Sequence, residues 1–349
     1  MGTINGISVI VCCYNSVGRI KPTLEHLLNQ KISGTILWEI IIVDNNSTDK
    51  TSSFCKELLE GSKMAYSIVL EKRQGLSFAR KTGYDTAQYN LLLFVDDDNW
   101  LADNYIQTAY SIMNEHATVA ILGGKGSPVF SESTIVPEWF QSFQQSYAVG
   151  AQSDNTSIDL QYVTLVYGAG FVLRKEYWER LFEIGFESLL PGRKGKSLLS
   201  GEDTELCLAI TMLGGKVMYA SNLSLKHFIP KNRLTWEYLS KLYFGFGRAK
   251  TYISIYLTIE NNKGNPQHNL KLPFWFDRSI HLCKEIIAFK TKHRLWFYNR
   301  KNRTGNGDYL RLQGLQGELF ELVSTRRKIT DKYNQVILLK DRIKELHRQ

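Results

Sequence analysis

The sequence of 349 residues lacks long apolar runs, internal repeats and low-complexity tracts. No apolar run approaches the roughly 20 residues that a bilayer-spanning helix needs, so we expect no transmembrane segment. The first residues, MGTINGISVIVCCYN, carry no basic group before their apolar run, and we therefore expect no secretory signal peptide. These absences predict a globular protein whose only possible contact with a membrane is at the membrane surface.

Cysteine is scarce, and the pairs of cysteines that bind zinc are missing. The five cysteines are scattered along the chain without a C-x-x-C spacing, which argues against a zinc site. Cys12 and Cys13 are neighbours on a predicted strand, so their side chains point to opposite faces. This pattern is typical of reduced thiols in a cytoplasmic protein.

Glycine-rich phosphate loops are also absent from the first strand-to-helix turn. The segment CCYNSVGRIK contains no G-x-G-x-x-G, which disfavours a NAD-binding Rossmann domain. It also lacks the glycine-rich, lysine-bearing loop expected of a nucleotidyltransferase, although that class shares an α/β nucleotide fold and metal-binding carboxylates.

Acidic residues are fewer than basic residues in this sequence. The formal net charge is +9 and the isoelectric point about 9.1. Such an excess suits nucleic acid, an anionic membrane surface or a phosphate-bearing substrate, and charge alone does not choose among them. Because no nucleic-acid-binding motif accompanies the charge, we expect no nucleic-acid partner.

The residues that are present alternate between two patterns through the first third of the chain. Short β-branched apolar runs predict strands, and amphipathic segments between them predict helices. The predicted strands cover 7–13, 38–44, 66–72, 90–96 and 118–124, and the predicted helices cover 19–30, 45–61, 75–87 and 101–116. This alternation predicts an α/β fold with a mainly parallel central sheet flanked by helices.

Three polar clusters follow predicted strands, at Tyr14-Asn15, at 44–46 (Asp-Asn-Asn) and at 96–98 (Asp-Asp-Asp). Ligands of parallel α/β sheets bind at the carboxyl ends of the strands, so we expect these clusters to meet at one ligand-binding edge. Adjacent carboxylates suit a hard divalent cation such as Mg²⁺ or Mn²⁺, which offsets their mutual repulsion. A solvated turn with helix-capping aspartates is the structural alternative.

Five segments, taken in order, resemble the successive signatures of the family 2 inverting glycosyltransferases. They are SVIVCCYN, EIIIVDNNSTDKT, GLSFARKTGYDTAQYNLLLFVDDDNW, GAGFVLRKE and GEDTELCLAITMLGGKVMYASNLSLKHFIP. The resemblance spans about 7–230 and implies the GT-A fold, with a nucleotide-sugar half over 1–126 and an acceptor half over 127–230. A mostly helical, basic C-terminal extension over 231–349 lies outside it.

The resemblance implies a nucleotide site and a metal site. Tyr14 would stack on the base, Asp44 would accept a base N–H, and Arg80 would lie near the nucleotide. Asp98 and Asp96 match the metal-binding pair, either Asp96 or Asp97 would hold the ribose, and His227 would complete the metal site. The residues alone also allow structural roles for these side chains, such as a capping aromatic, a surface charge or a structural histidine.

The resemblance also implies a catalytic base in GEDTEL. Asp203 would take the proton from the acceptor hydroxyl as its oxygen attacks the anomeric carbon. Glu202 would contact the acceptor or orient the loop. A helix N-terminus stabilises carboxylates, so capping is the alternative role for both. The nearby basic residues Arg193, Lys194 and Lys196 suit either a pyrophosphate contact or a solvated charge run.

The resulting hypothesis is an inverting glycosyltransferase that moves a sugar from a nucleotide diphosphate, with UDP the expected nucleotide. The expected acceptor is a hydroxyl of a glycan or lipid-linked oligosaccharide in cell-surface polysaccharide synthesis. The alternatives are a nucleotidyltransferase and a non-catalytic membrane-docking protein built on a retired glycosyltransferase domain. A retired enzyme would tend to lose some of the set Asp44, Asp96, Asp98, Asp203 and His227, and all five are present.

The C-terminal third mixes aromatic and basic residues. Its segment 274–303 suits either an anionic membrane leaflet or a helical appendage on the catalytic domain. The last segment, 321–349, predicts a basic amphipathic helix that forms an oligomer or docks elsewhere. We therefore expect a cytoplasmic protein and leave open a peripheral position on the inner face of the membrane.

Overall fold

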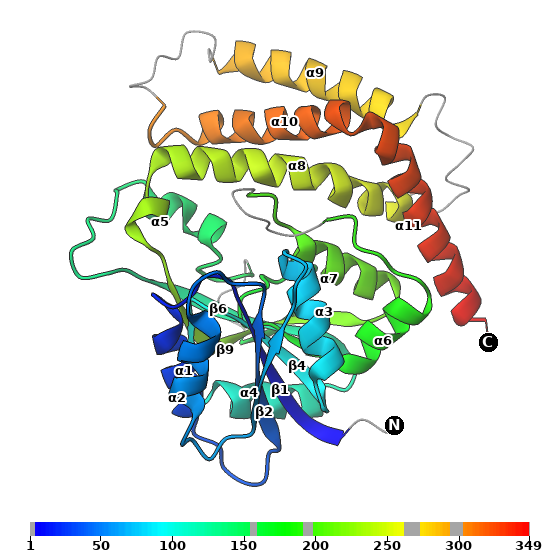
Figure 1. Ribbon diagram of the computed structural model, residues 1–349. Coiled ribbons are helices and arrows are strands. Elements are labelled where there is room, and N and C mark those ends of the chain that lie inside the picture. Colours follow the sequence, from blue (N-terminus) through cyan, green and yellow to red (C-terminus); the bar gives the residue numbers. More distant parts are fainter. Residues whose placement is uncertain (1–3, 154–158, 191–197, 262–272, 294–302, 349) are drawn as a thin grey trace. The chain divides into compact units, whose positions relative to one another are not determined.

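The computed structural model describes residues 4–153, 159–190, 198–261, 273–293 and 303–348 (Figure 1). The chain divides into two compact units, and each combines segments that are distant in sequence. The first unit contains Met1–Glu132, Tyr147–Glu183 and Leu206–Ile229, and the second contains Ser133–Ser146, Ile184–Glu205 and Pro230–Gln349.

A nine-stranded sheet forms the centre of the first unit, with the order β3-β2-β1-β4-β8-β6-β9-β5 and with β7 paired to β9. The strands are β1 Ile4–Cys13, β2 Trp38–Asp44, β3 Tyr66–Leu70, β4 Tyr89–Asp96, β5 Asn99–Leu101, β6 Val119–Val129, β7 Leu160–Tyr162, β8 Val172–Arg174 and β9 Lys216–Phe228. The four strands at the β3 end are parallel, which confirms the predicted α/β class.

The other half of the sheet is mixed. The short strand β8 lies antiparallel between β4 and β6, while β5 and β7 run antiparallel to β9. Two details of the sequence-based prediction were wrong here. The helix predicted over 101–116 begins only at Tyr105, because Asn99–Leu101 forms β5. The runs KVMYAS and LSLKHFIP, at 216–221 and 223–230, predict two short strands, and they form the single strand β9.

Helices cover both faces of this sheet. They are α1 Ile20–Leu28, α2 Thr51–Leu59, α3 Leu76–Thr86, α4 Tyr105–Glu115 and α6 Lys175–Glu183. Alternate residues of the central strands, such as Val9, Ile40 and Leu93, pack in one core with α1, α2 and α4. The intervening residues point to the opposite face, where Phe94 stacks on Trp178 of α6 with ring centroids 6.1 Å apart.

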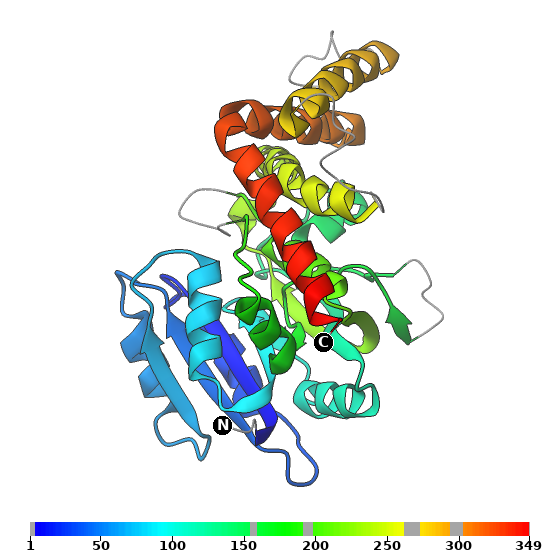
Figure 2. The same ribbon diagram turned by 90° about the vertical axis from the view of Figure 1, so that its right-hand side faces the viewer.

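The second unit is helical. It contains α5 Phe140–Phe143, α8 Trp236–Asn261, α9 Phe274–Lys292, α10 Gly307–Ser324 and α11 Arg326–Leu346, together with the first turn of α7 Glu202–Met212. Helix α10 lies between α8 and α9, and α11 runs across these helices (Figures 1 and 2). None of the helices in the described residues combines the length and the apolarity needed to cross a membrane.

The apolar face of α11 is buried within the second unit, where Ile329, Val336 and Ile343 belong to the core. The apolar side of this amphipathic helix is therefore covered by other residues of the same chain. Self-association through this region stays a prediction.

Helices α8 and α10 approach each other closely through glycine. A Cβ added at Gly247 would lie 1.8 Å from the carbonyl oxygen of Gly314, far inside contact distance. A Cβ added at Gly314 would meet only the Tyr243 carbonyl oxygen, at 3.7 Å. Both glycines thus lie in the contact between α8 and α10, but only Gly314 has room for a methyl group.

We expect Gly247→Ala to lower the free energy of unfolding by about 1–3 kcal/mol, because the new methyl group forces α8 and α10 apart. Gly314→Ala is the matched control and should be neutral or stabilise by up to about 1 kcal/mol, because alanine favours the helix and finds room. Urea unfolding of both variants tests this. Equal effects of the two substitutions would contradict it.

Candidate functional site

The three adjacent carboxylates at the end of β4 point in different directions. Asp96 ends the strand, and Asp97 and Asp98 form the turn into β5. Side chains alternate along a strand, so Asp96 continues the face of Phe94 while Asp97 turns to the opposite face. The repulsion expected from three neighbouring charges is thereby reduced.

Asp96 lies beside a buried cation. Arg80 of α3 is only 5% exposed, and its guanidinium lies over the rings of Phe94 and Phe171, at 5.7 and 5.5 Å from their centroids. Burial and the charge of Asp98 raise the pKa of Asp96 to about 6, and the charge of Arg80 opposes this rise. The predicted basic residue near the nucleotide is thus a buried partner of the acidic cluster and not a surface charge.

Asp97 braces the loop between β1 and α1. Its two carboxylate oxygens accept hydrogen bonds from Nε and Nη2 of Arg19, at 2.9 and 2.7 Å, and Oδ2 also accepts one from the Ser16 hydroxyl. The same guanidinium donates to the carbonyl oxygens of Tyr14 and Asn15. Asp97 therefore holds the loop that carries Tyr14, while ribose binding by Asp96 or Asp97 stays a prediction.

Asp98 meets His227, which lies 129 residues further along the sequence but beside it in the sheet, where Asn99 pairs with His227. The His227 Nε2 lies 3.5 Å from the Asp98 Oδ1, and both residues are buried. The His227 Nδ1 lies 2.8 Å from the Tyr147 carbonyl oxygen, which can only accept, so Nδ1 carries the hydrogen. The other ring nitrogen then faces a carboxylate, an arrangement that a proton or a cation between them satisfies.

The acidic end of β4 is the place where a hard divalent cation is predicted. Within the described ranges, no group of three or more His, Cys, Asp and Glu side chains is arranged to hold a metal ion. Mg²⁺, however, is usually bound by one or two protein carboxylates together with substrate phosphates and water. The Asp98 carboxylate with its neighbour His227 is a contribution of that size, and metal binding by Asp98, Asp96 and His227 stays a prediction.

The rim at the ends of β1 and β2 contains Tyr14 and Asp44. Tyr14 is 39% exposed, and its hydroxyl accepts a hydrogen bond from Gln74 at 3.4 Å. Asp44 is 6% exposed, and its Oδ1 accepts a hydrogen bond from the Ser47 backbone N–H. An exposed aromatic ring and a largely buried carboxylate at neighbouring strand ends suit stacking on a base and acceptance of a base N–H.

The sequence places Asn15, Asn45 and Asn46 at this edge, but it does not reveal which loops they hold. The amide of Asn45 donates to the carbonyl oxygens of Glu71 and Arg73 and accepts from the Gly75 N–H, so it holds the loop before α3. Asn15 and Asn46 adopt φ of 49° and 62°, a region in which asparagine is enriched. The asparagines directly after β1 and β2 were the available signal, and only their contacts identify their role.

Glu202 and Asp203 begin α7 and belong to the second unit. Both are half-buried, Glu202 Oε2 accepts a hydrogen bond from the Gly201 N–H, and Asp203 Oδ1 accepts one from the Thr204 N–H. The N-terminus of a helix is a favourable position for a carboxylate, because the partial positive charge of the helix dipole lies there. Arg193, Lys194 and Lys196 lie outside the described residues.

The model of the family described as "Glycosyl transferase family 2" matches residues 8–182, half of the chain. The chain belongs to this family. It is 27% identical to the glycosyltransferase GlyA of Streptococcus pneumoniae over 246 residues, which cover 67% of this chain and 32% of GlyA. It is 21% identical to the glucosyl-dolichyl phosphate glucuronosyltransferase of Haloferax volcanii over 294 residues, covering 80% of this chain and 87% of that protein.

A likeness to a solved structure accompanies these relatives. The structure of TarS residues 1–349 from S. aureus in complex with UDP aligns with a TM-score of 0.49 and 17% identity, covering 92% of this chain and 91% of that chain. The family membership and the α/β architecture together confirm the predicted glycosyltransferase class and fold. Asp203 and His227 lie beyond the residues that the family model matches.

We expect Asp97→Ala to lower the free energy of unfolding by about 1–3 kcal/mol, because it leaves the half-buried Arg19 guanidinium without its carboxylate and the buried Ser16 hydroxyl without its acceptor. Asp103→Ala removes the exposed ion pair with Lys31 and serves as the control, for which we expect no measurable change. Urea unfolding compares the two. A stable Asp97→Ala protein would show that this carboxylate is free for a ligand and does not brace the loop.

Proposed function

We propose that this glycosyltransferase transfers a sugar with inversion, from a nucleotide diphosphate to a hydroxyl of a glycan or lipid-linked acceptor. The observation that carries the proposal is the contact of Asp98 with His227. Both side chains are buried, both are of types that bind metal ions, and strand pairing brings them together beside Asp96. Tyr14 and Asp44 at the ends of β1 and β2 suit the base of the donor. Uridine stays the expected base.

The protein groups have separate tasks in this reaction. Tyr14 and Asp44 bind the base, and Asp98, with His227 and Asp96, would hold Mg²⁺ or Mn²⁺. When bound, such an ion neutralises charge on the diphosphate leaving group. Arg80, buried beside Asp96, limits the repulsion within the acidic cluster.

Asp203 acts as the general base. It accepts the proton of the acceptor hydroxyl while that oxygen forms a bond to the anomeric carbon, and the bond from this carbon to the diphosphate oxygen breaks. The electron pair leaves with the diphosphate. A single displacement inverts the anomeric configuration.

The acceptor is proposed from the relatives. The relative from Haloferax volcanii that matches most of its own length is named for a dolichyl phosphate substrate, which supports a lipid-linked acceptor here. Because this chain spans about a third of GlyA, that relative carries no argument about the acceptor. Cell-surface polysaccharide synthesis is the process that we propose, and contact with an anionic membrane surface stays a prediction.

The experiment that tests the proposal is a screen of nucleotide sugars for release of the nucleotide diphosphate, with glycan and lipid-linked acceptors present. Release with at least one donor, accompanied by a product of inverted anomeric configuration, is the expected result. A retained configuration would overturn the inverting mechanism. Nucleotide binding without release from any donor would favour the retired-enzyme alternative.

We expect Asp98→Ala to abolish the effect of Mn²⁺ on nucleotide diphosphate binding. Loss of a direct ligand should weaken metal-dependent binding more than the roughly 10–100-fold that loss of an outer partner costs. Calorimetry with and without Mn²⁺ measures this. Asp103→Ala, which removes an exposed carboxylate from the connection between β5 and α4, is the control. Full Mn²⁺-dependent binding by Asp98→Ala would refute the assignment.

We expect Asp203→Asn to lower kcat by about 10²–10⁴-fold, the typical contribution of a general base, while nucleotide affinity stays nearly unchanged. A product assay beside a binding assay separates the two quantities. Glu202→Gln, on the same helical turn, is the matched control and should lower kcat by a smaller factor than Asp203→Asn. Normal turnover by Asp203→Asn would remove this residue from the mechanism.

A further inference from the structure

Helix α7 carries a buried carboxylate for which the proposed reaction has no use. Glu205 lies in the first turn of α7, two residues after Asp203, and is 0% exposed. A carboxylate at such a depth is costly unless donors surround it. Its surroundings therefore indicate what it holds in place.

Four donors converge on Glu205. Its Oε1 accepts hydrogen bonds from the Leu189 N–H at 2.7 Å and from the Tyr256 hydroxyl at 2.8 Å. Its Oε2 accepts from the Leu190 N–H at 3.2 Å and from the Ser188 hydroxyl at 2.5 Å. One side chain thus joins the start of α7 to the segment 188–190 and to the C-terminal part of α8.

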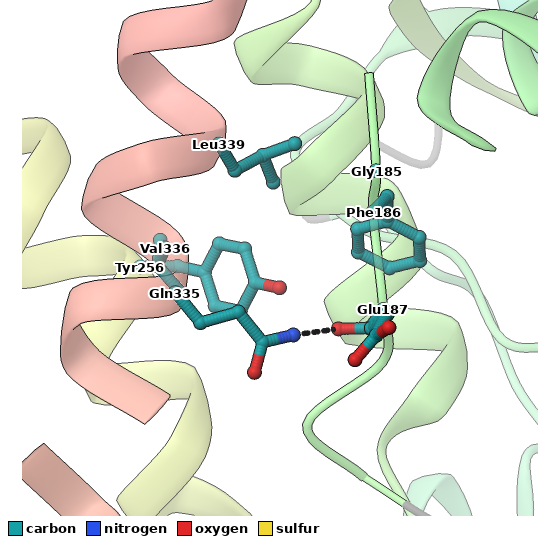
Figure 3. Close-up of a pocket in the computed structure, with 7 residues that line it drawn as sticks. All are labelled: Gly185, Phe186, Glu187, Tyr256, Gln335, Val336 and Leu339. Atoms are coloured by element: carbon teal, nitrogen blue, oxygen red, sulfur yellow. Dashed lines mark hydrogen bonds between the residues drawn. The ribbon is translucent and has the colours of Figure 1, made fainter. Parts of the chain in front are cut away.

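The other side of this segment is held by α11. Three long side chains of α11 donate hydrogen bonds to backbone carbonyl oxygens of this segment. Lys332 donates to Leu189 at 2.8 Å, Gln335 to Glu187 at 2.6 Å and Arg342 to Ile184 at 2.8 Å. Figure 3 shows the Gln335 contact beside a small pocket that Tyr256 and Phe186 also line. The segment 184–190, which we call the strap, is therefore anchored along its whole length.

The turn that precedes α7 rests on the same parts. Gly201 has φ of 132°, a conformation that favours glycine, and a Cβ there would meet Ala249 at 3.3 Å and Leu190 at 3.5 Å. The backbone N–H of Glu205 donates to the Gly201 carbonyl oxygen at 2.9 Å. The first turn of α7 is thus positioned by the strap and α8 together.

Helix geometry relates this anchor to the proposed base. Residues two apart on a helix of 3.6 residues per turn are separated by about 200°, so the Glu205 and Asp203 side chains leave α7 on nearly opposite sides. We propose that Glu205 is a positioning residue, which fixes the rotation of the first turn of α7 so that Asp203 is presented to the acceptor. This inference rests on the proposed function of Asp203.

Substitution by glutamine should disturb this anchor without emptying its space. Burial raises the pKa of Glu205, and the four hydrogen bonds favour its ionised form, which can accept all of them. In Glu205→Gln one acceptor oxygen becomes a donor amide and faces a backbone N–H. The strap and α7 must then shift relative to each other.

The test compares Glu205→Gln with Glu318→Gln in the full chain. Glu318 is also 0% exposed and lies in the same unit, where Arg278 and Lys250 pair with it, away from α7. We expect Glu205→Gln to lower kcat about 10–100-fold, because small misplacements of a catalytic group reach that size, with donor KM unchanged. Glu318→Gln should keep its kcat at temperatures where both proteins are folded.

Hydrogen exchange of the backbone amides supplies a readout that needs no activity. In Glu205→Gln, exchange should rise at 188–190 and in the first turn of α7, whereas in Glu318→Gln it should rise in α8–α10. Unchanged exchange at 188–190 and 202–206 would overturn the inference, as would equal losses of kcat in both variants. If the wild-type protein releases diphosphate from no donor, the proposed function fails, and the exchange result still decides whether Glu205 positions α7.

Discussion

Three adjacent carboxylates can occupy one strand end only if their charges are separated or neutralised, and the candidate site is arranged around that constraint. Strand alternation sends Asp96 toward Arg80 and Asp97 toward Arg19. The turn into β5 then places Asp98 against His227, across a pairing between Asn99 and His227. Each carboxylate thereby has its own partner, and the partners come from α3, from the β1–α1 loop and from β9.

Polar side chains also hold the loops around the carboxylates in place. Arg19 is bound to Asp97 and also to the carbonyl oxygens of Tyr14 and Asn15, and Asn45 holds the loop before α3. The groups expected to bind a nucleotide therefore sit on loops that polar side chains fix before any ligand arrives. Such pre-organisation reduces the entropy lost on binding. The strap in the second unit is anchored by the same means, with Glu205 on one side and α11 on the other.

Several parts of the fold were accessible from the sequence because their signal is local. The apolar runs of β1, β2 and β4 are continuous, since parallel strands are buried on both faces. The helices α1, α2 and α3 carry an apolar stripe and end near turn residues. Strand β5 was not predicted, because three residues carry no usable periodicity and its existence depends on pairing with β9.

The sequence by itself determined the α/β class, the family, and which carboxylates and histidine are candidates for chemistry, because residue type and order are enough for those inferences. Only the tertiary structure decided how the candidates differ. It made Asp97 a brace, buried Arg80 against the stacked rings of Phe94 and Phe171, and set His227 beside Asp98. It also identified Glu205, whose partners at 188–190 and at Tyr256 are brought together by packing and share no local pattern. Contacts between distant segments depend on strand order and helix packing, which no short stretch of sequence encodes.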